Sequence, residues 1–264
     1  MRVAVAGGAG RMSRMLTGAV NNAGDMVLAG VLSRRPSRPG LSTDIGEVRD
    51  SGGYVESDVD DILKDADVLI DFTRPEAVSA HLAAAARHRV ALVIGTTGLS
   101  DAQVEEIRRT AAVTPIVFAP CMSESVTHLL SLLERAASMF GEGYDIEIVE
   151  AHHRNKTDAP SGTALAMGEA IAAAQGRSLA ECAIYGRQGE TGPRARGAIG
   201  FAAVRGGDIV GEHTVMFLGH GHRIEITHRA MSRQAYVDGA LEAARFLRGG
   251  QHGLFDMKDV VGIH

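Results

Sequence analysis

The 264-residue chain has little of what marks secreted, membrane or nucleic-acid-binding proteins. Its two cysteines, Cys121 and Cys182, are too few for a disulfide framework. No apolar run reaches the roughly 18 residues of a transmembrane helix, and the first residues do not resemble a secretory leader. The net charge of −5 provides no basic field for a polyanion. These absences predict a cytoplasmic enzyme that binds neither membranes nor nucleic acid.

A glycine-rich turn follows a short apolar strand at the start of the chain. Val3 and Val5 mark the strand, and a helical pattern through Leu16 comes after the turn, which consists of Gly7, Gly8, Ala9, Gly10, Arg11 and Met12. Glycines let backbone amides approach a pyrophosphate, and a helix N-terminus adds partial positive charge. This order predicts a dinucleotide-binding unit, although many other βα turns also contain two glycines.

Further apolar segments predict parallel strands of the same sheet at residues 68–71, 90–94 and 116–119. The turns after them lie at the carboxyl ends of the strands, where ligands bind in open α/β sheets. We therefore expect the cofactor site to include the residues of these turns, namely Phe72, Thr73, Gly95, Thr96, Thr97, Ala119, Pro120, Cys121 and Met122.

The choice between NADPH and NADH depends on the strand expected at residues 26–32. Folds of this kind that prefer NAD usually carry an acidic residue after this strand, whereas an arginine accommodates the 2′-phosphate of NADP. This chain has Ser33, Arg34 and Arg35 there. Arg34 therefore favours NADPH, with NADH as the alternative, unless the two arginines only form a solvated turn.

The pattern changes after residue 122. Residues 123–140 predict one amphipathic helix, and residues 144–151 alternate polar with apolar, with Asp145, Glu147 and Glu150 set against Ile146 and Ile148. Such alternation indicates an antiparallel or open-faced strand. The remaining expected elements are a helix at 162–174, a glycine-rich loop at 186–197, strands near 199–204, 210–218 and 223–228, and a last helix at 233–247.

The fold class is accordingly predicted to be α/β, with two domains. Residues 1–122 and 234–264 form a Rossmann-type dinucleotide-binding domain, because the last helix has an apolar face suited to the first sheet. Residues 123–233 form a second, α+β domain on an open mixed sheet, which we expect to bind substrate and to mediate oligomerisation.

Four basic side chains occupy five positions at the end of the strand at 144–151. They are His152, His153, Arg154 and Lys156. Adjacent strand residues point to opposite faces, so the two histidines do not bind one metal, and no metal site is predicted. One imidazole should face the cofactor and the other a substrate carboxylate. The neighbouring cations should help Lys156 to release a proton, although most lysines are simply solvated.

A predicted helix start follows this cluster. Ser161 is a good N-cap, and Gly162 and Thr163 would present free backbone amides. A helix N-terminus beside several cations forms an anion site. The segment therefore predicts binding of a small dicarboxylate that receives a proton.

Residues 150–164 resemble the signature segment of the 4-hydroxy-tetrahydrodipicolinate reductases of the diaminopimelate and lysine pathway. The resemblance covers nearly the whole chain and includes residues 7–12, 71–73, 95–98, 197–207 and 211–215. It implies a Rossmann domain completed by the C-terminal helix, a smaller sheet domain that assembles a homotetramer, and hydride transfer from NADPH or NADH to the dehydrated substrate, which yields tetrahydrodipicolinate without a metal.

The resemblance also implies roles for individual residues. His152 would donate or accept a proton and Lys156 would be the general acid. The substrate carboxylates would be held by His153, Ser161, Gly162 and Thr163. Arg233 matches an arginine of the family's interdomain region.

Several residues depart from the family pattern. Ser13 replaces a third glycine, and Cys121, Ser123, Ser125 and Thr127 replace other residues of a later segment. Cys121 is either an inert packing residue or a reactive thiol. Two alternatives to the lysine-pathway enzyme stay open, namely a paralogous NADPH-dependent reductase of another cyclic imine dicarboxylate and a non-catalytic nucleotide-binding sensor.

Overall fold

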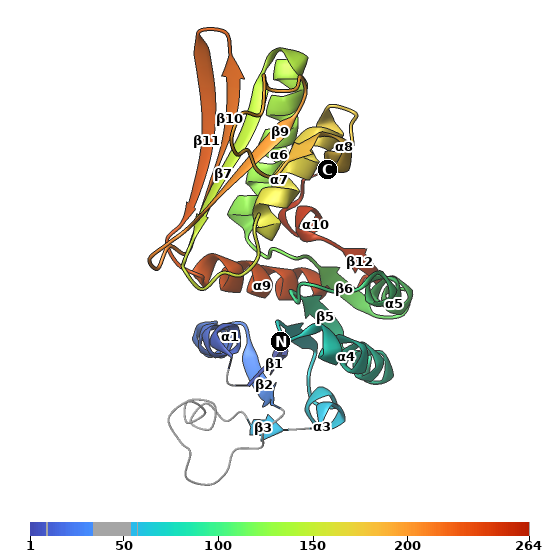
Figure 1. Ribbon diagram of the computed structural model, residues 1–264. Coiled ribbons are helices and arrows are strands. Elements are labelled where there is room, and N and C mark those ends of the chain that lie inside the picture. The colour runs from blue at the N-terminus through green and yellow to red at the C-terminus, as the bar shows by residue number, and fades with distance from the viewer. Residues whose placement is uncertain (9, 34–53, 57, 264) are drawn as a thin grey trace. The chain divides into compact units, whose positions relative to one another are not determined.

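The computed structural model describes residues 1–8, 10–33, 54–56 and 58–263 (Figure 1). The chain divides into two compact units. Unit 1 consists of Met1–Glu124 and Gln234–His264, and unit 2 consists of Ser125–Arg233. Among the described residues, no helix combines the length and the apolar character that crossing a bilayer requires.

The described residues of unit 1 contain a parallel sheet of seven strands in the order β12-β6-β5-β4-β1-β2-β3. Its strands are β1 (Arg2–Ala6), β2 (Val27–Leu32), β3 (Tyr54–Glu56), β4 (Val68–Asp71), β5 (Ala91–Ile94), β6 (Pro115–Phe118) and β12 (Gly253–Phe255). The chain leaves β1 in one direction to form β2 and β3, and then returns to the other side of β1 with β4. This is the doubly wound Rossmann arrangement, and the prediction of the fold class is confirmed.

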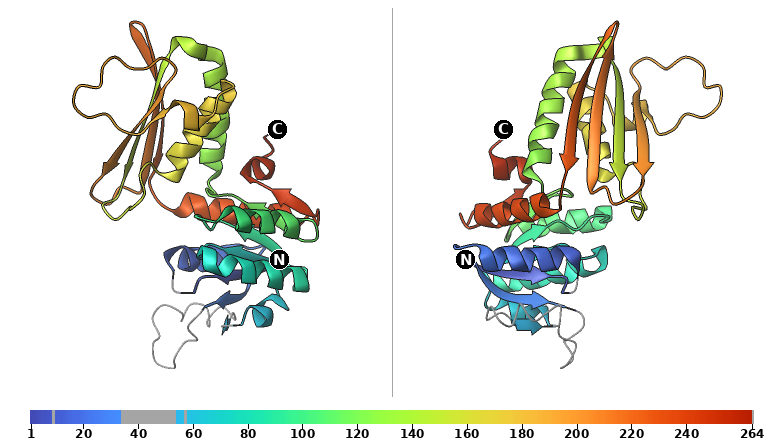
Figure 2. Two further views of the ribbon diagram at one scale, coloured as in Figure 1. Left: turned by 45° about the vertical axis from the view of Figure 1, so that its right-hand side comes forward. Right: turned by 90° about the vertical axis from the view of Figure 1, so that its left-hand side faces the viewer.

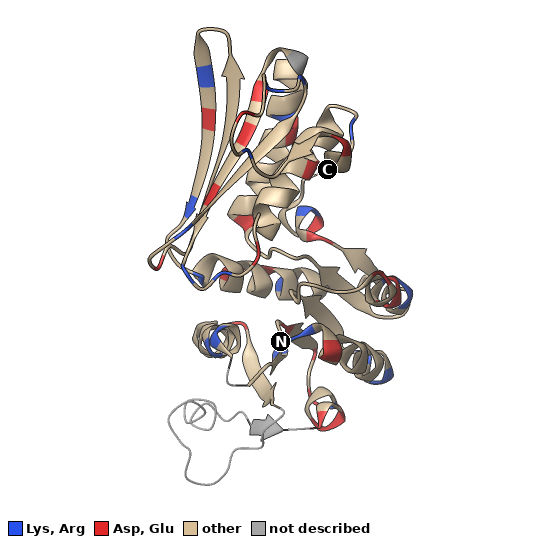
Figure 3. Cartoon of the chain, viewed as in Figure 1, with Lys and Arg blue, Asp and Glu red and all other residues tan. Residues whose placement is uncertain are grey.

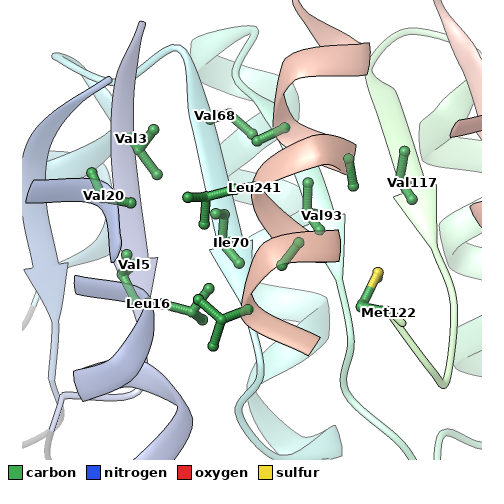
Figure 4. Packing of buried hydrophobic residues seen from close by; sticks show 14 of the residues in the cluster. Val3, Val5, Leu16, Val20, Val68, Ile70, Val93, Val117, Met122 and Leu241 are labelled. Carbon is green, nitrogen blue, oxygen red and sulfur yellow. The ribbon is translucent and has the colours of Figure 1, made fainter. Parts of the chain in front are cut away.

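Helices cover both faces of this sheet, because the strand side chains alternate between two apolar clusters. Val3 and Val5 of β1 lie in the cluster with helices α1 (Arg11–Asn22) and α9 (Gln234–Leu247), as Figure 4 shows. The neighbouring residues Ala4 and Ala6 lie in the other cluster. The helices on that second face are α3 (Val59–Leu63), α4 (Pro75–His88) and α5 (Asp101–Ala111).

Local signals in the sequence set several helix ends of unit 1. Pro75 is the first residue of α4, where its missing N–H costs no helical hydrogen bond. Ser100 and Gln103 form a capping box at the start of α5. The short helix α10 (Met257–Val261) begins at the capping box of Asp256 and Asp259. These local signals fix where the helices begin after the turns that follow the strands.

Helix α6 (Glu124–Phe140) lies in unit 2 from its second residue onward, and this unit contains a mixed sheet in the order β11-β10-β7-β9-β8. The other elements are η1 (Gly141–Gly143), β7 (Asp145–His152), α7 (Gly162–Ala174), α8 (Leu179–Cys182), β8 (Ala183–Ile184), β9 (Ile199–Arg205), β10 (Gly211–Gly219) and β11 (His222–Ala230). Strand β7 pairs antiparallel with β10 and parallel with β9. The parallel pair requires a crossover, and that crossover contains α7.

Helices α6 and α7 pack on one face of this sheet (Figure 2). The even-numbered residues of β7 face the helices, so Ile146 and Ile148 are buried. Acidic and basic residues both occur along the strands of this sheet (Figure 3). On the opposite face, the carboxylate of Glu147 is bound by Arg187 and Arg194. The face that bears α7 therefore holds the core of unit 2.

Short elements were not expected from the sequence. They include β3, β8, β12, α8 and α10, which have two to five residues each. Segments of this length are too short to give a clear periodic pattern. The long elements lie within about two residues of the expected bounds.

Candidate functional sites

The basic segment of unit 2 lies between the end of β7 at His152 and the start of α7 at Gly162. Backbone bonds fix this connection, because the amide of Gly206 donates to the carbonyl of His152 and the amide of Arg154 donates to that of Gly207. The tip of the loop after β9 thus lies beside the loop after β7. The four basic residues are held against the carboxyl end of β9.

A buried carboxylate, Glu150, connects three parts of this site. Arg205 of β9 donates two hydrogen bonds of 2.7 Å to it, one to each oxygen. Nδ1 of His152 lies 2.6 Å from Oε2, and the amide of Ser161 donates to Oε1 at 3.1 Å. Burial alone would raise the pKa of Glu150, but the hydrogen bonds from Arg205 and His152 outweigh it, so the pKa lies below its ordinary value.

The sequence interpretation of Glu150 was wrong on one point. It placed Glu150 with Asp145 and Glu147 on the polar side of the strand, but Glu150 has the parity of Ile146 and Ile148 and is 1% exposed. A strand with period two puts residues of one parity on one face. The carboxylate therefore points into the unit, where only paired charges are stable.

His152 is buried and neutral at the end of β7. Burial lowers its pKa below the ordinary value, despite the opposing effect of the Glu150 carboxylate. Its ring meets that of His213 edge to face at a centroid distance of 5.1 Å. Nε2 has no hydrogen-bond partner within the described residues, and a Cβ atom on Gly211 would lie 3.0 Å from it. Gly211 thus leaves space beside the unpaired nitrogen.

His213 of β10 supports the start of α7. Its Nε2 lies 2.8 Å from the hydroxyl of Ser161, which also accepts the amide of Ala164 at 3.1 Å. Burial, and next the nearby ring of His152, lower the pKa of His213 to about 4. Ser161 is the predicted N-cap, and its amide and hydroxyl both have partners inside the protein.

The first amides of α7 are arranged to receive an anion. The amides of Gly162 and Thr163 have no acceptor among the described residues, and the first turn of α7 contains no acidic residue. Free amides and the helix dipole both favour negative charge at this position. A carboxylate fits here by ordinary hydrogen bonding.

Lys156 lies on the loop that leads to α7. Its Nζ is 2.8 Å from Oδ2 of Asp158, an acceptor that was not expected from the sequence. Burial would raise the pKa of Asp158, but the hydrogen bond from Lys156 outweighs this effect and lowers the pKa below its ordinary value. The carboxylate is therefore charged. The carbonyl of Asp158 accepts from Arg205, which also binds Glu150. One set of hydrogen bonds therefore links Lys156 to His152.

His153 follows the end of β7 and contacts the last residue of unit 2. Nη2 of Arg233 lies 3.4 Å from its Nε2, and its Nδ1 is buried without a partner in the described part of the chain. Neither histidine belongs to a metal cluster, because no group of three or more His, Cys, Asp or Glu suited to a metal occurs among the described residues.

In unit 1, the turns expected to bind cofactor lie together at the carboxyl ends of β1, β4, β5 and β6. Gly7 and Gly8 have φ of 116° and 46°, which favour glycine, and a Cβ on Gly8 would clash with the side chain of Ser33. Helix α1 begins at Arg11 after Gly10, without a side-chain cap or an acidic first turn. Ala9 and Arg34 lie outside the described residues.

A second buried carboxylate shapes the turns after β4 and β5. Oδ1 of Asp71 accepts from the amide and the hydroxyl of Thr73, at 2.8 and 2.6 Å, and from the hydroxyl of Thr96 at 3.3 Å. Oδ2 lies 2.6 Å from Nδ1 of His81. Burial would raise the pKa of Asp71, but the bonds from His81 and Thr73 lower it.

The remaining cofactor candidates are placed by backbone packing. The ring of Phe72 lies over Gly95, where a Cβ would come within 2.4 Å of it. Thr97 follows Thr96 in the same turn. After β6, the amide of Ala119 donates to the carbonyl of Ile94, Pro120 and the half-buried Cys121 follow, and Met122 is fully buried in the first core cluster. The side chain of Met122 is thus a core residue.

Family models match both units. The N-terminal model of dihydrodipicolinate reductase matches residues 1–122, and the C-terminal model matches residues 125–261. The chain belongs to the dihydrodipicolinate reductase family. It is an NAD(P)H-dependent oxidoreductase of that family, and the resemblance read from the sequence is confirmed.

Relatives of this family align over the full chain. The 4-hydroxy-tetrahydrodipicolinate reductase of Burkholderia ambifaria is 57% identical over 265 residues and covers 100% of both chains. A solved dipicolinate-bound dihydrodipicolinate reductase from a Paenisporosarcina species has a TM-score of 0.70 at 26% identity and covers 97% of each chain. A probable dehydrogenase from Thermotoga maritima, with a TM-score of 0.63 at 12% identity over 100% of this chain and 93% of its own, shares the fold alone.

Four residues of the hydrogen-bonded network in unit 2 had no assigned role in the sequence interpretation. They are Glu150, Asp158, Arg205 and His213, and in unit 1 Asp71 was quoted only as part of a motif. One signal was available for Glu150, since an acidic residue at an inward position of an alternating strand must have a buried partner. The partner itself, Arg205, lies 55 residues later in the chain, and no local pattern connects the two.

Proposed function

We propose that the chain reduces 4-hydroxy-tetrahydrodipicolinate, by way of dihydrodipicolinate, to tetrahydrodipicolinate in the diaminopimelate and lysine pathway. The observation that carries this proposal is the presence, in one unit, of two free amides at the start of α7 together with His152 and Lys156, all joined by one hydrogen-bond network. The names of the relatives, which refer to the same substrate class, give independent support.

The residues of unit 1 fit a nicotinamide dinucleotide. Gly7 and Gly8 have backbone conformations that favour glycine, a side chain at position 8 would collide with Ser33, and the uncapped start of α1 suits a pyrophosphate. The turns at Phe72–Thr73, Gly95–Thr97 and 119–122 would line the rest of the cofactor. When bound, the reduced nicotinamide supplies a hydride.

The residues of unit 2 then have separate tasks. The amides of Gly162 and Thr163 hold one carboxylate of the substrate, with Ser161 fixing the helix start, and His153 contacts the other carboxylate. Lys156 donates the proton that accompanies hydride transfer. Orientation of the ring contributes most of the rate, and general acid catalysis contributes roughly 10²–10⁴-fold.

The test is turnover with freshly prepared substrate, followed by the loss of reduced-nicotinamide absorbance. Lys156→Ala should lower kcat by roughly 10²–10⁴-fold and keep cofactor binding, because the cofactor turns lie in unit 1. Lys64→Ala is the matched control. Lys64 also forms an ion pair with an aspartate, Asp61, at 3.0 Å, but it lies at the C-terminal end of α3 in unit 1. No turnover with either cofactor in the unaltered protein would refute the proposal.

The result also separates the alternatives. Tight NADPH binding with poor turnover of this substrate would indicate a paralogous reductase. A nucleotide-dependent function that survives Lys156→Ala would indicate a sensor. The retention of an acid, an anion-binding helix start and two imidazoles in one network favours the enzyme.

We further propose that NADPH is preferred over NADH. The support is the sequence after β2, which has Arg34 and no acidic residue at the position that contacts the ribose in folds of this kind. Arg34→Asp should lower kcat/KM for NADPH and leave that for NADH less affected. Steady-state kinetics with both cofactors measure this, and an unchanged ratio in the variant would remove the argument.

A homotetramer in the cytoplasm completes the proposal. Its support is the face of the second sheet that α6 and α7 do not cover, where Val204 is exposed and Val149, Met216 and Leu218 are only partly buried. Sedimentation analysis should give a mass of about four chains. A monomer across the working concentration range would exclude this assembly, and recovery in a membrane or secreted fraction would exclude the location.

A further inference from the structure

Glu150 was not among the expected substrate-binding residues, yet its carboxylate contacts three other residues of the site. Its carboxylate joins β7 to Arg205 of β9 and to the first residues before α7. Four donors surround its two oxygens, at distances from 2.6 to 3.1 Å. A carboxylate held in this way accepts hydrogen bonds and donates none.

This acceptor determines where His152 carries its hydrogen. In a neutral imidazole one ring nitrogen is a donor and the other an acceptor. Because Oε2 of Glu150 can only accept, Nδ1 of His152 must be the donor across the 2.6 Å contact. Nε2 is then the acceptor nitrogen, and it is the one with no partner among the described residues. The hydrogen bond thus selects one of two tautomers.

The same carboxylate also fixes the helix start. Oε1 accepts the amide of Ser161, the N-cap of α7, and thereby orients the next two amides of the chain. His152 and the anion-binding amides therefore share one anchor. A shift of Glu150 would move both together.

We propose that Glu150 is the positioning residue of this site: it holds His152 in the tautomer with hydrogen on Nδ1, so that Nε2 is presented to the substrate as a proton acceptor, and it fixes the amides of α7 beside it. The inference rests on the proposed function and decides an alternative that the sequence left open. Lys156 is the proton donor, and His152 in its resting state is an acceptor.

The charges around His152 agree with this assignment. The ring faces Glu150 on β7, Arg205 on β9, His213 on β10 and Lys156 on the loop before α7. Arg205 neutralises Glu150 within the pair, and burial keeps the pKa of His152 below its ordinary value. Loss of water on the way to dihydrodipicolinate removes a proton from a ring carbon together with the hydroxyl group. When Nε2 takes up that proton and passes it to the leaving hydroxide, the carboxylate stabilises the transient imidazolium, as an aspartate does beside the histidine of a catalytic triad.

The decisive variant is Glu150→Gln. The side-chain oxygen of glutamine would accept from Arg205, which leaves its NH₂ group to face Nδ1 of His152. The imidazole would then carry its hydrogen on Nε2. We expect kcat to fall by roughly 10²–10⁴-fold, the range for loss of general acid–base function, with KM for NADPH largely unchanged. Loss of the carboxylate should also move the pH dependence of the residual kcat to lower pH.

Glu147→Gln is the matched control. Glu147 lies on the same strand and its carboxylate is likewise held by arginine, in this case by Arg187 and Arg194, but it points to the other face and contacts no imidazole among the described residues. It should keep the wild-type kcat and pH profile. An equal loss in both variants would overturn the proposal, because it would indicate a general effect of removing an ion pair.

The tautomer can be measured without any turnover. In protein labelled with ¹⁵N-histidine, the signals of His152 are identified by their loss in His152→Asn. We expect Nδ1 to be protonated and Nε2 unprotonated in the unaltered protein at neutral pH, and a reversed or mixed pattern in Glu150→Gln. Hydrogen on Nε2 in the unaltered protein would overturn the proposal even if Glu150→Gln fails to fold. The expected tautomer in a chain that reduces no dicarboxylate would support the role of Glu150 and refute the proposed function.

Discussion

His213 should make unit 2 less stable as the pH falls from neutrality. Its pKa is about 4 in the folded chain against 6.5 for an ordinary histidine, and the residue is 3% exposed. Between those two values the unfolded chain binds a proton that the folded chain does not, so acid favours unfolding. The contribution of neutral His213 to the free energy of unfolding is fully present above about pH 6.5 and is lost as the pH falls toward 4.

The magnitude follows from the two pKa values. At about 1.4 kcal/mol for each pH unit between them, the full effect is roughly 3 kcal/mol, of which about 2 kcal/mol is lost by about pH 5. The ordinary pKa values of carboxyl groups lie lower, so most of their effect comes at more acidic pH. His152 and His228 also have pKa values lowered by burial, and they add to the same trend.

Hydrogen exchange measured by mass spectrometry on peptides from β10 gives the local free energy of opening, after correction for the intrinsic pH dependence of exchange. His213→Asn should remove about 2 kcal/mol of the loss between about pH 7.5 and 5, and should keep the share of the other two histidines. His220→Asn, which changes an exposed ring on the turn after β10, should keep the full loss. A His213→Asn variant with the unaltered slope would refute the reasoning.

Three further substitutions test the packing on which the sites depend. Gly239→Ala should destabilise unit 1 by about 1–3 kcal/mol or more, because the new Cβ would lie 1.7 Å from the carbonyl oxygen of Met122. Gly18→Ala on α1 has open space around the new Cβ and should stabilise unit 1 by about 0.5–1 kcal/mol. The same change in both variants, measured by calorimetry, would contradict this expectation. Ser161→Ala should lower the urea midpoint by the equivalent of about 1 kcal/mol through loss of the N-cap, and an unchanged midpoint would argue against the cap. Asp71→Asn should cost about 1–3 kcal/mol and weaken NADPH binding in a fluorescence titration, and unchanged affinity would show that the Thr73 turn forms without the charge.

Much of the fold could be predicted from the sequence because the long elements have strong local patterns. Strand β4 and helix α7 have the predicted bounds, since the apolar run of β4 and the cap at Ser161 are both local signals. The parallel partner of β7 could not be predicted, because the alternation in β7 indicates a half-covered strand and does not say which strand lies beside it.

In the candidate site too, local features could be predicted from the sequence and long-range contacts could not. The basic residues and the helix start are adjacent in the chain, so their pattern is visible. The contacts of Glu150 with Arg205, and of Ser161 with His213, join residues 55 and 52 positions apart. Such contacts depend on how the strands pair. The sequence therefore indicated which chemistry to expect, and only the fold shows which partners hold it in place.

The crossover between β7 and β9 has a consequence for how the molecule forms. The two strands pair in parallel, so residues 153–198 must close a long loop before the pair is made. Closure of such a loop reduces chain entropy before any pairing energy is gained, and non-local strand pairs form slowly for this reason. We expect the helices of unit 2 and the β10–β11 hairpin to appear early after dilution from denaturant. Binding competence should emerge late, when Arg205 finally reaches Glu150.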